Sequence, residues 1–112
     1  MIEKYTFGEF VIDGKKYKSN VVLIGKDAKP GRYLTEHLLM IDDFIEIVES
    51  HPEIIVIGTG ADGVVDVPDE IISFIESKKI KLIIEKTEEA CAVYNSFLKK
   101  GKKIGAFLHN TC

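Results

Sequence analysis

The sequence predicts a single α/β domain with three layers, in which an N-terminal antiparallel hairpin joins a mixed sheet that continues through parallel β-α-β-α-β units. From residue 42 onward, short apolar runs alternate with amphipathic stretches, an order that implies parallel strands joined by right-handed crossovers. Before that, alternating apolar residues flank Asp13-Gly14, a pair that favours a hairpin turn. The length of 112 residues matches one domain, which we expect over residues 1–112.

The expected strands are short and apolar. They are the hairpin arms, with Tyr5, Phe7, Phe10, Ile12 and Tyr17, and then residues 21–24, 54–57, 80–84 and 104–108. The run VVLI at residues 21–24 is typical of a strand that is buried on both faces. Residues 25–32, which include Pro30-Gly31, are expected to form a loop. Residues 33–41 indicate neither a helix nor a strand.

Three helices are expected between the later strands. The first covers Asp42 to about Ser50, and the second begins at Pro68, because proline suits the first position of a helix. The third has the clearest signals: Thr87 is placed to cap its N-terminus and Gly101 to close its C-terminus. Its apolar stripe comprises Ala90, Val93, Tyr94, Phe97 and Leu98.

Composition and charge argue against several classes of function. A net charge of −3 and a pI of about 5.6 do not favour nucleic acid or an anionic membrane as a partner. No apolar run approaches the ~20 residues that cross a bilayer, and the N-terminus enters strand-like sequence without a signal region. Cys91 and Cys112 are too few for a disulfide scaffold. We therefore expect a cytoplasmic protein.

Three glycines at residues 58, 60 and 63 form the pattern G-x-G-x-x-G after a predicted strand, a pattern that binds pyrophosphate when the last glycine enters a helix. Here residues 64–67 separate the glycines from the helix expected at Pro68, and Asp62 and Asp66 bring negative charge to the same loop. The glycines are therefore expected to form turns, and no cofactor is expected.

The carboxyl ends of parallel strands border one crevice in an open α/β sheet. Residues 58–60, 85–87 and 109–112 follow three of the expected strands, so they are expected to converge. His109 and Cys112 are an incomplete zinc site, because His37 and His51 are the only other histidines. Thiol catalysis would require a rigid Cys112, which is expected to fray. No metal is expected.

Several stretches together resemble one known family. They are the hairpin FGEFVIDGKKY, VIGTG followed by a proline-led helix, Glu-Lys-Thr before a helix with A…YN, and GAFLHNTC. They resemble the domain-of-unknown-function family DUF498, with its Mth938-like fold, over nearly the whole chain. The family includes a mitochondrial complex I assembly factor and an adipogenesis-associated protein.

The resemblance implies a mixed-sheet α/β domain whose molecular activity is not established. Many relatives carry a tryptophan in the third strand, which this chain lacks. If that aromatic surface binds a partner in the relatives, the partner of this chain is expected to differ, and the mitochondrial role is not carried over. The candidate ligand-binding residues, taken from the crevice and the family pattern, are Gly58, Thr59, Gly60, Glu85, Thr87, Asn95 and His109.

The expected function is that of a small cytoplasmic module that binds a protein partner or a small ligand at the crevice, without established catalysis. The alternative is an enzyme that binds a nucleotide or phosphate ligand at the strand ends. A third hypothesis is a thiol or metal protein built on His109 and Cys112. We assign no catalytic residue.

Overall fold

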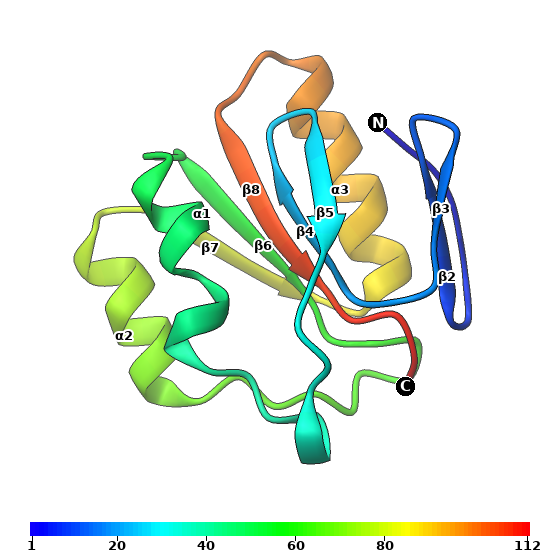
Figure 1. The fold of residues 1–112 in the computed structure, drawn as a ribbon. Coiled ribbons are helices and arrows are strands. Elements are labelled where there is room, and N and C mark those ends of the chain that lie inside the picture. The colour runs from blue at the N-terminus through cyan, green and yellow to red at the C-terminus, as the bar shows by residue number, and fades with distance from the viewer.

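Two sheets form the framework of the computed structural model, which describes residues 1–112 (Figure 1). The smaller sheet is antiparallel and consists of β1 (Ile2–Thr6), β2 (Glu9–Ile12) and β3 (Lys15–Tyr17). The larger sheet contains, in spatial order, β5 (Asp27–Pro30), β4 (Val21–Ile24), β8 (Ile104–Leu108), β6 (Ile54–Gly58) and β7 (Lys81–Glu85).

The larger sheet is mixed, as expected. Strand β6 is parallel to both β7 and β8, whereas β4 is antiparallel to β8 and to β5. The antiparallel strands of this sheet are thus β4 and β5. The expectation that the N-terminal hairpin joins the mixed sheet is wrong, because β1, β2 and β3 pair only with one another and form a sheet of their own. A second turn at Phe7-Gly8, where Gly8 has a φ of 90°, divides the first expected arm into β1 and β2.

The expectation of a loop over residues 25–32 is wrong, because residues 27–30 form strand β5. The chain reverses at Gly25-Lys26, and Gly25 has a φ of 58° that suits glycine. Strand β5 lies at the edge of the sheet and pairs only with β4. An edge strand tolerates Pro30, since a missing N–H group is acceptable where no neighbour pairs.

The helices are α1 (Ile45–Glu49), α2 (Asp69–Ser77) and α3 (Thr87–Lys99). Part of the first expected helix is a separate 3-10 turn, η2 (Ile41–Asp43), and another such turn, η1 (Thr35–His37), precedes it. Pro68 immediately precedes α2, and Gly101 follows α3 with a φ of 74°. No helix is long and apolar enough to cross a membrane.

The helices cover both faces of the larger sheet. Helices α1 and α2 lie on one face, and α3 lies on the other, between this sheet and the smaller one (Figure 1). Residues of β6 alternate between the two cores: Ile54 and Val56 pack on the α3 side, whereas Ile55 and Ile57 pack on the α1 and α2 side. This alternation explains why the whole strand is apolar.

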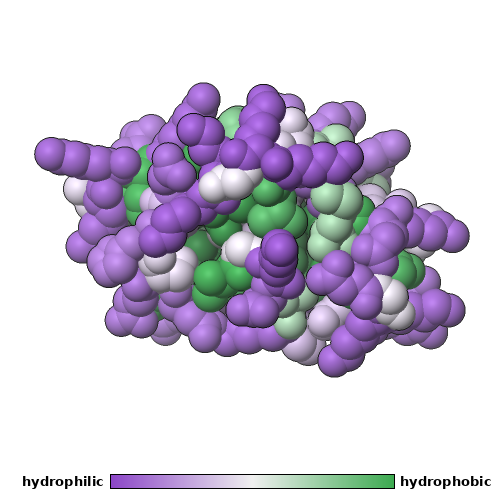
Figure 2. Space-filling model, turned by 90° about the horizontal axis from the view of Figure 1, so that it is seen from above, coloured by the Kyte–Doolittle hydropathy of each residue, from purple (hydrophilic) through white to green (hydrophobic).

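One end of the molecule carries the β4–β5 turn and the α3–β8 loop. Hydrophilic side chains surround a smaller hydrophobic area there (Figure 2). The chain end marked C lies at the opposite end, where β6, β7 and β8 finish (Figure 1). The three segments predicted to converge are therefore at the end that Figure 2 does not face.

Asn95 connects the smaller sheet to α3 through two hydrogen bonds. Its Oδ1 accepts a hydrogen bond from the N–H group of Ile2 at 3.0 Å, and its Nδ2 donates to the carbonyl of Ile2 at 2.8 Å. The side-chain amide thus pairs with β1 as a neighbouring strand would. This contact places a predicted ligand-binding residue in a structural role.

We expect Asn95→Ala to lower the free energy of unfolding by about 2 kcal/mol, because two partly buried hydrogen bonds are lost. Hydrogen exchange should also become faster in β1 than in β6. The measurements are urea denaturation and amide exchange, with the exposed neighbour substitution Ser96→Ala as the control. Equal stability of the two variants would contradict this role.

Candidate functional site

The three segments that follow β6, β7 and β8 meet, as the sequence predicts. The N–H group of Thr59 donates to the carbonyl of Glu85 at 2.9 Å, and the N–H group of His109 donates to the carbonyl of Gly58 at 3.0 Å. Six of the seven candidate residues gather here: Gly58, Thr59, Gly60, Glu85, Thr87 and His109. The convergence follows from the parallel order of these strands.

The hydroxyl of Thr87 joins all three segments. It accepts a hydrogen bond from the N–H group of Gly60 and donates one to the carbonyl of His109, both at 2.8 Å. Thr87 is completely buried. The expectation that it caps α3 is wrong: Lys86 occupies that position and makes no side-chain capping bond. The hydroxyl bonds other segments instead of its own helix.

The chain itself fills the space between these segments. The N–H groups of Ala61 and Val64 donate to the carbonyls of Thr111 and Cys112 at 2.8 and 2.9 Å. Gly60 has a φ of +107°, and a Cβ atom there would lie 2.3 Å from the carbonyl oxygen of Cys112. The glycine loop is therefore wrapped around residues 109–112.

Each glycine of the motif has a structural reason. A Cβ atom at Gly58 would come within 2.9 Å of Thr87 and of Leu108, and Gly63 turns with a φ of 71°. Helix α2 begins only at Asp69, so the motif does not lead into a helix N-terminus. Gly60 and Gly63 thus turn with positive φ angles, as predicted, whereas Gly58 is the last residue of strand β6.

Residues 109–112 are held by hydrogen bonds, and the expectation that Cys112 frays is wrong. The carbonyl of Asn110 accepts from the N–H group of Gly8 at 2.7 Å and from the hydroxyl of Tyr5 at 3.0 Å. The N–H group of Asn110 donates to Oδ1 of Asn20 at 2.9 Å. These partners belong to the first 20 residues of the chain, so only the folded protein brings them here.

Glu85 and Asn95 differ from the other candidates. The side chain of Glu85 is exposed, and its contribution at the strand ends is its carbonyl, which accepts from the backbone and the hydroxyl of Thr59. Asn95 lies two turns along α3 from Thr87, about 12 Å by helix geometry, and bonds β1. Asn95 is therefore the one candidate that the structure separates from the group.

His109 is buried, and its hydrogen bonds define its protonation. Asn20 donates through Nδ2 to the carbonyl of Arg32, so its Oδ1 accepts, and Nδ1 of His109 at 2.9 Å carries the proton. Nε2 then accepts from the hydroxyl of Thr111 at 3.2 Å. Burial, and to a lesser degree the neighbouring His37, lower the pKa of His109. The imidazole is therefore neutral at neutral pH.

His37 approaches the same group from another part of the chain. Its Nε2 lies 3.8 Å from Sγ of Cys112, and its ring meets that of His109 edge-on, with centroids 5.4 Å apart. Glu36 and His37 both adopt positive φ angles, 54° and 58°, which the sequence does not signal.

Cys91, unlike Cys112, lies in the core, and burial raises the pKa of its thiol to about 12. No group of three or more His, Cys, Asp or Glu side chains is arranged to hold a metal ion.

Arg32 organises the segment that carries His37. Its guanidinium donates to both carboxylate oxygens of Asp43, at 2.8 and 2.9 Å, and to the carbonyls of Tyr33 and Leu38, each at 3.0 Å. Asp43 also accepts from the N–H group of Met40 at 2.8 Å. No residue pattern singles out Arg32 or Asp43, because neither stands in a motif and eleven residues separate them.

Large apolar side chains are exposed along residues 33–45, which we name the 33–45 segment. The exposed fraction is 83% for Tyr33, 55% for Leu38, 45% for Met40 and 41% for Ile45. A groove of about 290 Å³ runs along this segment and is lined by Leu38, Leu39, Met40, Ile41, Asp42 and Glu70. This concentration of exposed apolar residues is the second candidate site, and the residue patterns did not predict it.

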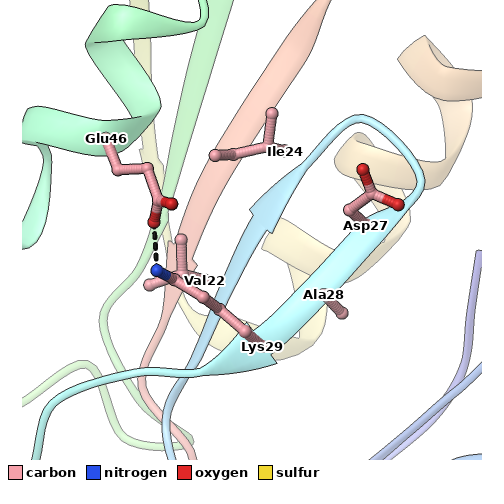
Figure 3. A pocket seen from close by; sticks show the side chains of 6 residues that line it. All are labelled: Val22, Ile24, Asp27, Ala28, Lys29 and Glu46. Atoms are coloured by element: carbon pink, nitrogen blue, oxygen red, sulfur yellow. Dashed lines mark ion pairs between the residues drawn. The ribbon is translucent and has the colours of Figure 1, made fainter.

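A smaller pocket of about 180 Å³ lies between α1 and the β4–β5 hairpin. It is lined by Val22, Ile24, Asp27, Ala28, Lys29 and Glu46 (Figure 3). Lys29 from β5 and Glu46 from α1 point toward each other and form an ion pair. Both side chains are more than half exposed, so the pair contributes little to stability.

The fold is that of an α/β domain of the Mth938-like class. The chain belongs to the family described as "Protein of unknown function (DUF498/DUF598)", whose model matches residues 2–109. The resemblance noted in the sequence is therefore confirmed, and so is the expected fold.

Solved structures with the same fold cover the whole chain. The conserved hypothetical protein PH1505 from Pyrococcus horikoshii OT3 is 24% identical with a TM-score of 0.88, and the match covers 100% of this chain and 99% of that one. The protein MT938 is 25% identical with a TM-score of 0.81, over 100% and 98%. A protein from Bartonella henselae described as an outer membrane protein is 20% identical with a TM-score of 0.86, over 99% and 94%.

We expect Gly60→Ala to lower the free energy of unfolding by more than about 3 kcal/mol, because the new methyl group meets backbone that cannot move aside. Gly101→Ala is the matched control, since Gly101 also has a positive φ but no atom lies within 4 Å of the place its Cβ would take. It should cost only about 1 kcal/mol. Urea denaturation measures both, and equal losses would refute the packing of Gly60 against Cys112.

Acidification should destabilise the protein through His109. Its pKa is lowered in the folded state, so the unfolded chain binds more protons as the pH falls below the ordinary histidine value, and stability then decreases with falling pH. We expect His109→Gln to reduce the loss of stability between about pH 7.5 and about pH 5.5. Unfolding free energies at both values measure it. His51→Gln, at an exposed position, is the control and should keep the wild-type difference.

Proposed function

We propose that this protein is a cytoplasmic protein-interaction module that acts by binding a partner without catalysing a reaction. The observation that carries the proposal is the exposure of Tyr33, Leu38 and Met40 on the 33–45 segment. Contiguous exposed apolar side chains are typical of protein-binding surfaces. A partner-binding role also agrees with the assembly-factor role that the family resemblance implies for some relatives.

The 33–45 segment is built to present these side chains in a defined arrangement. Arg32 holds Asp43 and two carbonyls of the segment, and Leu38 forms a parallel bridge with Asp66. Leu34 and Leu39, from the same segment, are buried in the core. A surface that is already ordered loses less conformational entropy when it binds, which supports recognition of a protein.

The alternative is a small-ligand site, or a nucleotide- or phosphate-binding enzyme, at Gly58, Thr59, Gly60, Glu85, Thr87 and His109. A ligand between these strand ends would have to displace residues 109–112. That displacement would break the hydrogen bonds from Ala61 and Val64. Thermal denaturation with nucleotides, phosphosugars and divalent metals tests this alternative, since a ligand at about 100 times its Kd adds about 2.7 kcal/mol.

We expect the double substitution Leu38→Asp with Met40→Asp to weaken partner binding at least about tenfold, because one buried anchor contributes about 1.4 kcal/mol or more. The melting temperature should stay close to the wild-type value, as both side chains are about half exposed and lie outside the buried core. The partner is isolated by affinity purification, purified and titrated against each variant by sedimentation velocity.

Phe7→Asp is the matched control, because Phe7 is 64% exposed and lies in the β1–β2 turn. Its affinity for the partner should equal that of the wild type. Equal binding by all three proteins would refute the assignment to the 33–45 segment. A specific stabilisation by a nucleotide that Gly60→Val abolishes would favour the enzyme instead.

A further inference from the structure

We infer that the groove along Leu38–Asp42 and Glu70 accepts a basic segment of the partner protein that inserts an apolar side chain. The inference rests on the proposed function and adds the chemistry of the partner. Four of the six residues that line the groove are apolar, and the other two, Asp42 and Glu70, are acidic. The groove thus offers an apolar floor with negative charge at its rim.

The stretch of chain that contains the groove residues carries charges of one sign only, and that sign is negative. Residues 33–77 contain eleven of the eighteen Asp and Glu residues and none of the fifteen Lys and Arg residues. Only two of these eleven, Asp43 and Glu46, form ion pairs, with Arg32 and Lys29. The other nine form no ion pair, and two of them, Asp42 and Glu70, line the groove. Such a field attracts a positively charged partner and excludes an acidic one.

The acidic residues lie beside the groove as well as along the chain. Asp42 follows the apolar run at residues 38–41, and Glu70 comes from the first turn of α2 across the groove. Asp66 pairs with Leu38 through the isolated bridge, and Glu36 precedes the run by two residues and is exposed. Two acidic residues thus line the groove, and two more lie close to Leu38, one along the chain and one through the backbone bridge.

A basic segment fits better than the other occupants of an apolar groove. An acidic surface repels the anionic head groups of a membrane. Outside residues 33–77 the chain contains fifteen Lys and Arg residues and seven Asp and Glu residues. A second copy of this chain therefore also carries basic residues, and the test below distinguishes it from a partner. Six residues line the groove, far fewer than the roughly 20–30 that each partner contributes to a standard interface, which favours a short segment.

The test uses the full chain and three synthetic peptides of equal length. The first is an amphipathic helix of Leu and Lys, the second replaces each Lys by Glu, and the third is a scrambled form of the first. Fluorescence anisotropy at low and high salt measures binding, and amide chemical shifts locate it. We expect the Lys peptide to bind at residues 38–42 and at Glu70, and to weaken about tenfold or more at high salt.

Two variants with the same change of net charge separate the groove from general attraction. Asp42→Lys with Glu70→Lys should weaken binding of the Lys peptide about tenfold, whereas Glu88→Lys with Glu89→Lys, at the start of α3, should leave it near the wild-type value. Equal weakening by both pairs, or equal binding of the Glu peptide, would overturn the inference. Salt-sensitive self-association of the wild type that Asp42→Lys with Glu70→Lys abolishes would overturn it in favour of a second copy.

Failure of the basic partner chemistry is distinguishable from failure of the proposed function. If the purified partner loses affinity for the Leu38→Asp, Met40→Asp variant while the Lys peptide does not bind, the interaction module stands and the basic chemistry of its partner is wrong. If neither the partner nor the Lys peptide responds to substitutions on the 33–45 segment, both proposals fail.

Discussion

A buried hydroxyl at the carboxyl ends of the parallel strands is the constraint on which the rest of the structure depends. Thr87 satisfies the N–H group of Gly60 and the carbonyl of His109 at once. Without it, two backbone groups in the segments that follow β6 and β8 would be buried without these partners, which costs about 1–3 kcal/mol for each group. The same contact sets the course of the glycine loop around residues 109–112. No buried side-chain polar atom is left without a partner.

Under the proposed function, the protein binds its partner away from the strand ends. In many open α/β sheets that end holds a ligand, but here residues 109–112 occupy it and bond the glycine loop. The neighbouring 33–45 segment exposes large apolar side chains instead, and its backbone is held by Arg32 and Asp43. The side chain of Asp43 is only 3% exposed, whereas that of Arg32 is 38% exposed, so water reaches this ion pair from the arginine side.

The sequence predicted the regular elements best where the apolar positions of a helix or strand pattern are the positions that the fold buries. The apolar stripe of α3 and the apolar runs of β6 and β8 are such cases, because their neighbours are adjacent in the fold and cover them on the expected faces. Strand β5 was missed because Pro30 and the charged residues of an edge strand resemble a loop. Thr87 was misjudged because a capping position and a buried tertiary bond require the same residue type.

By itself, the sequence determined the α/β class, the parallel order of the last three strands and the convergence of their ends, since alternation and short connections leave few topologies. It also fixes the unequal distribution of charge along the chain. Only the tertiary structure decided that Asn95 bonds β1, that His37 meets Cys112, and that Asp42 and Glu70 line one apolar groove. Those contacts join residues far apart in the chain, and they depend on non-periodic turns whose backbone angles no local pattern specifies.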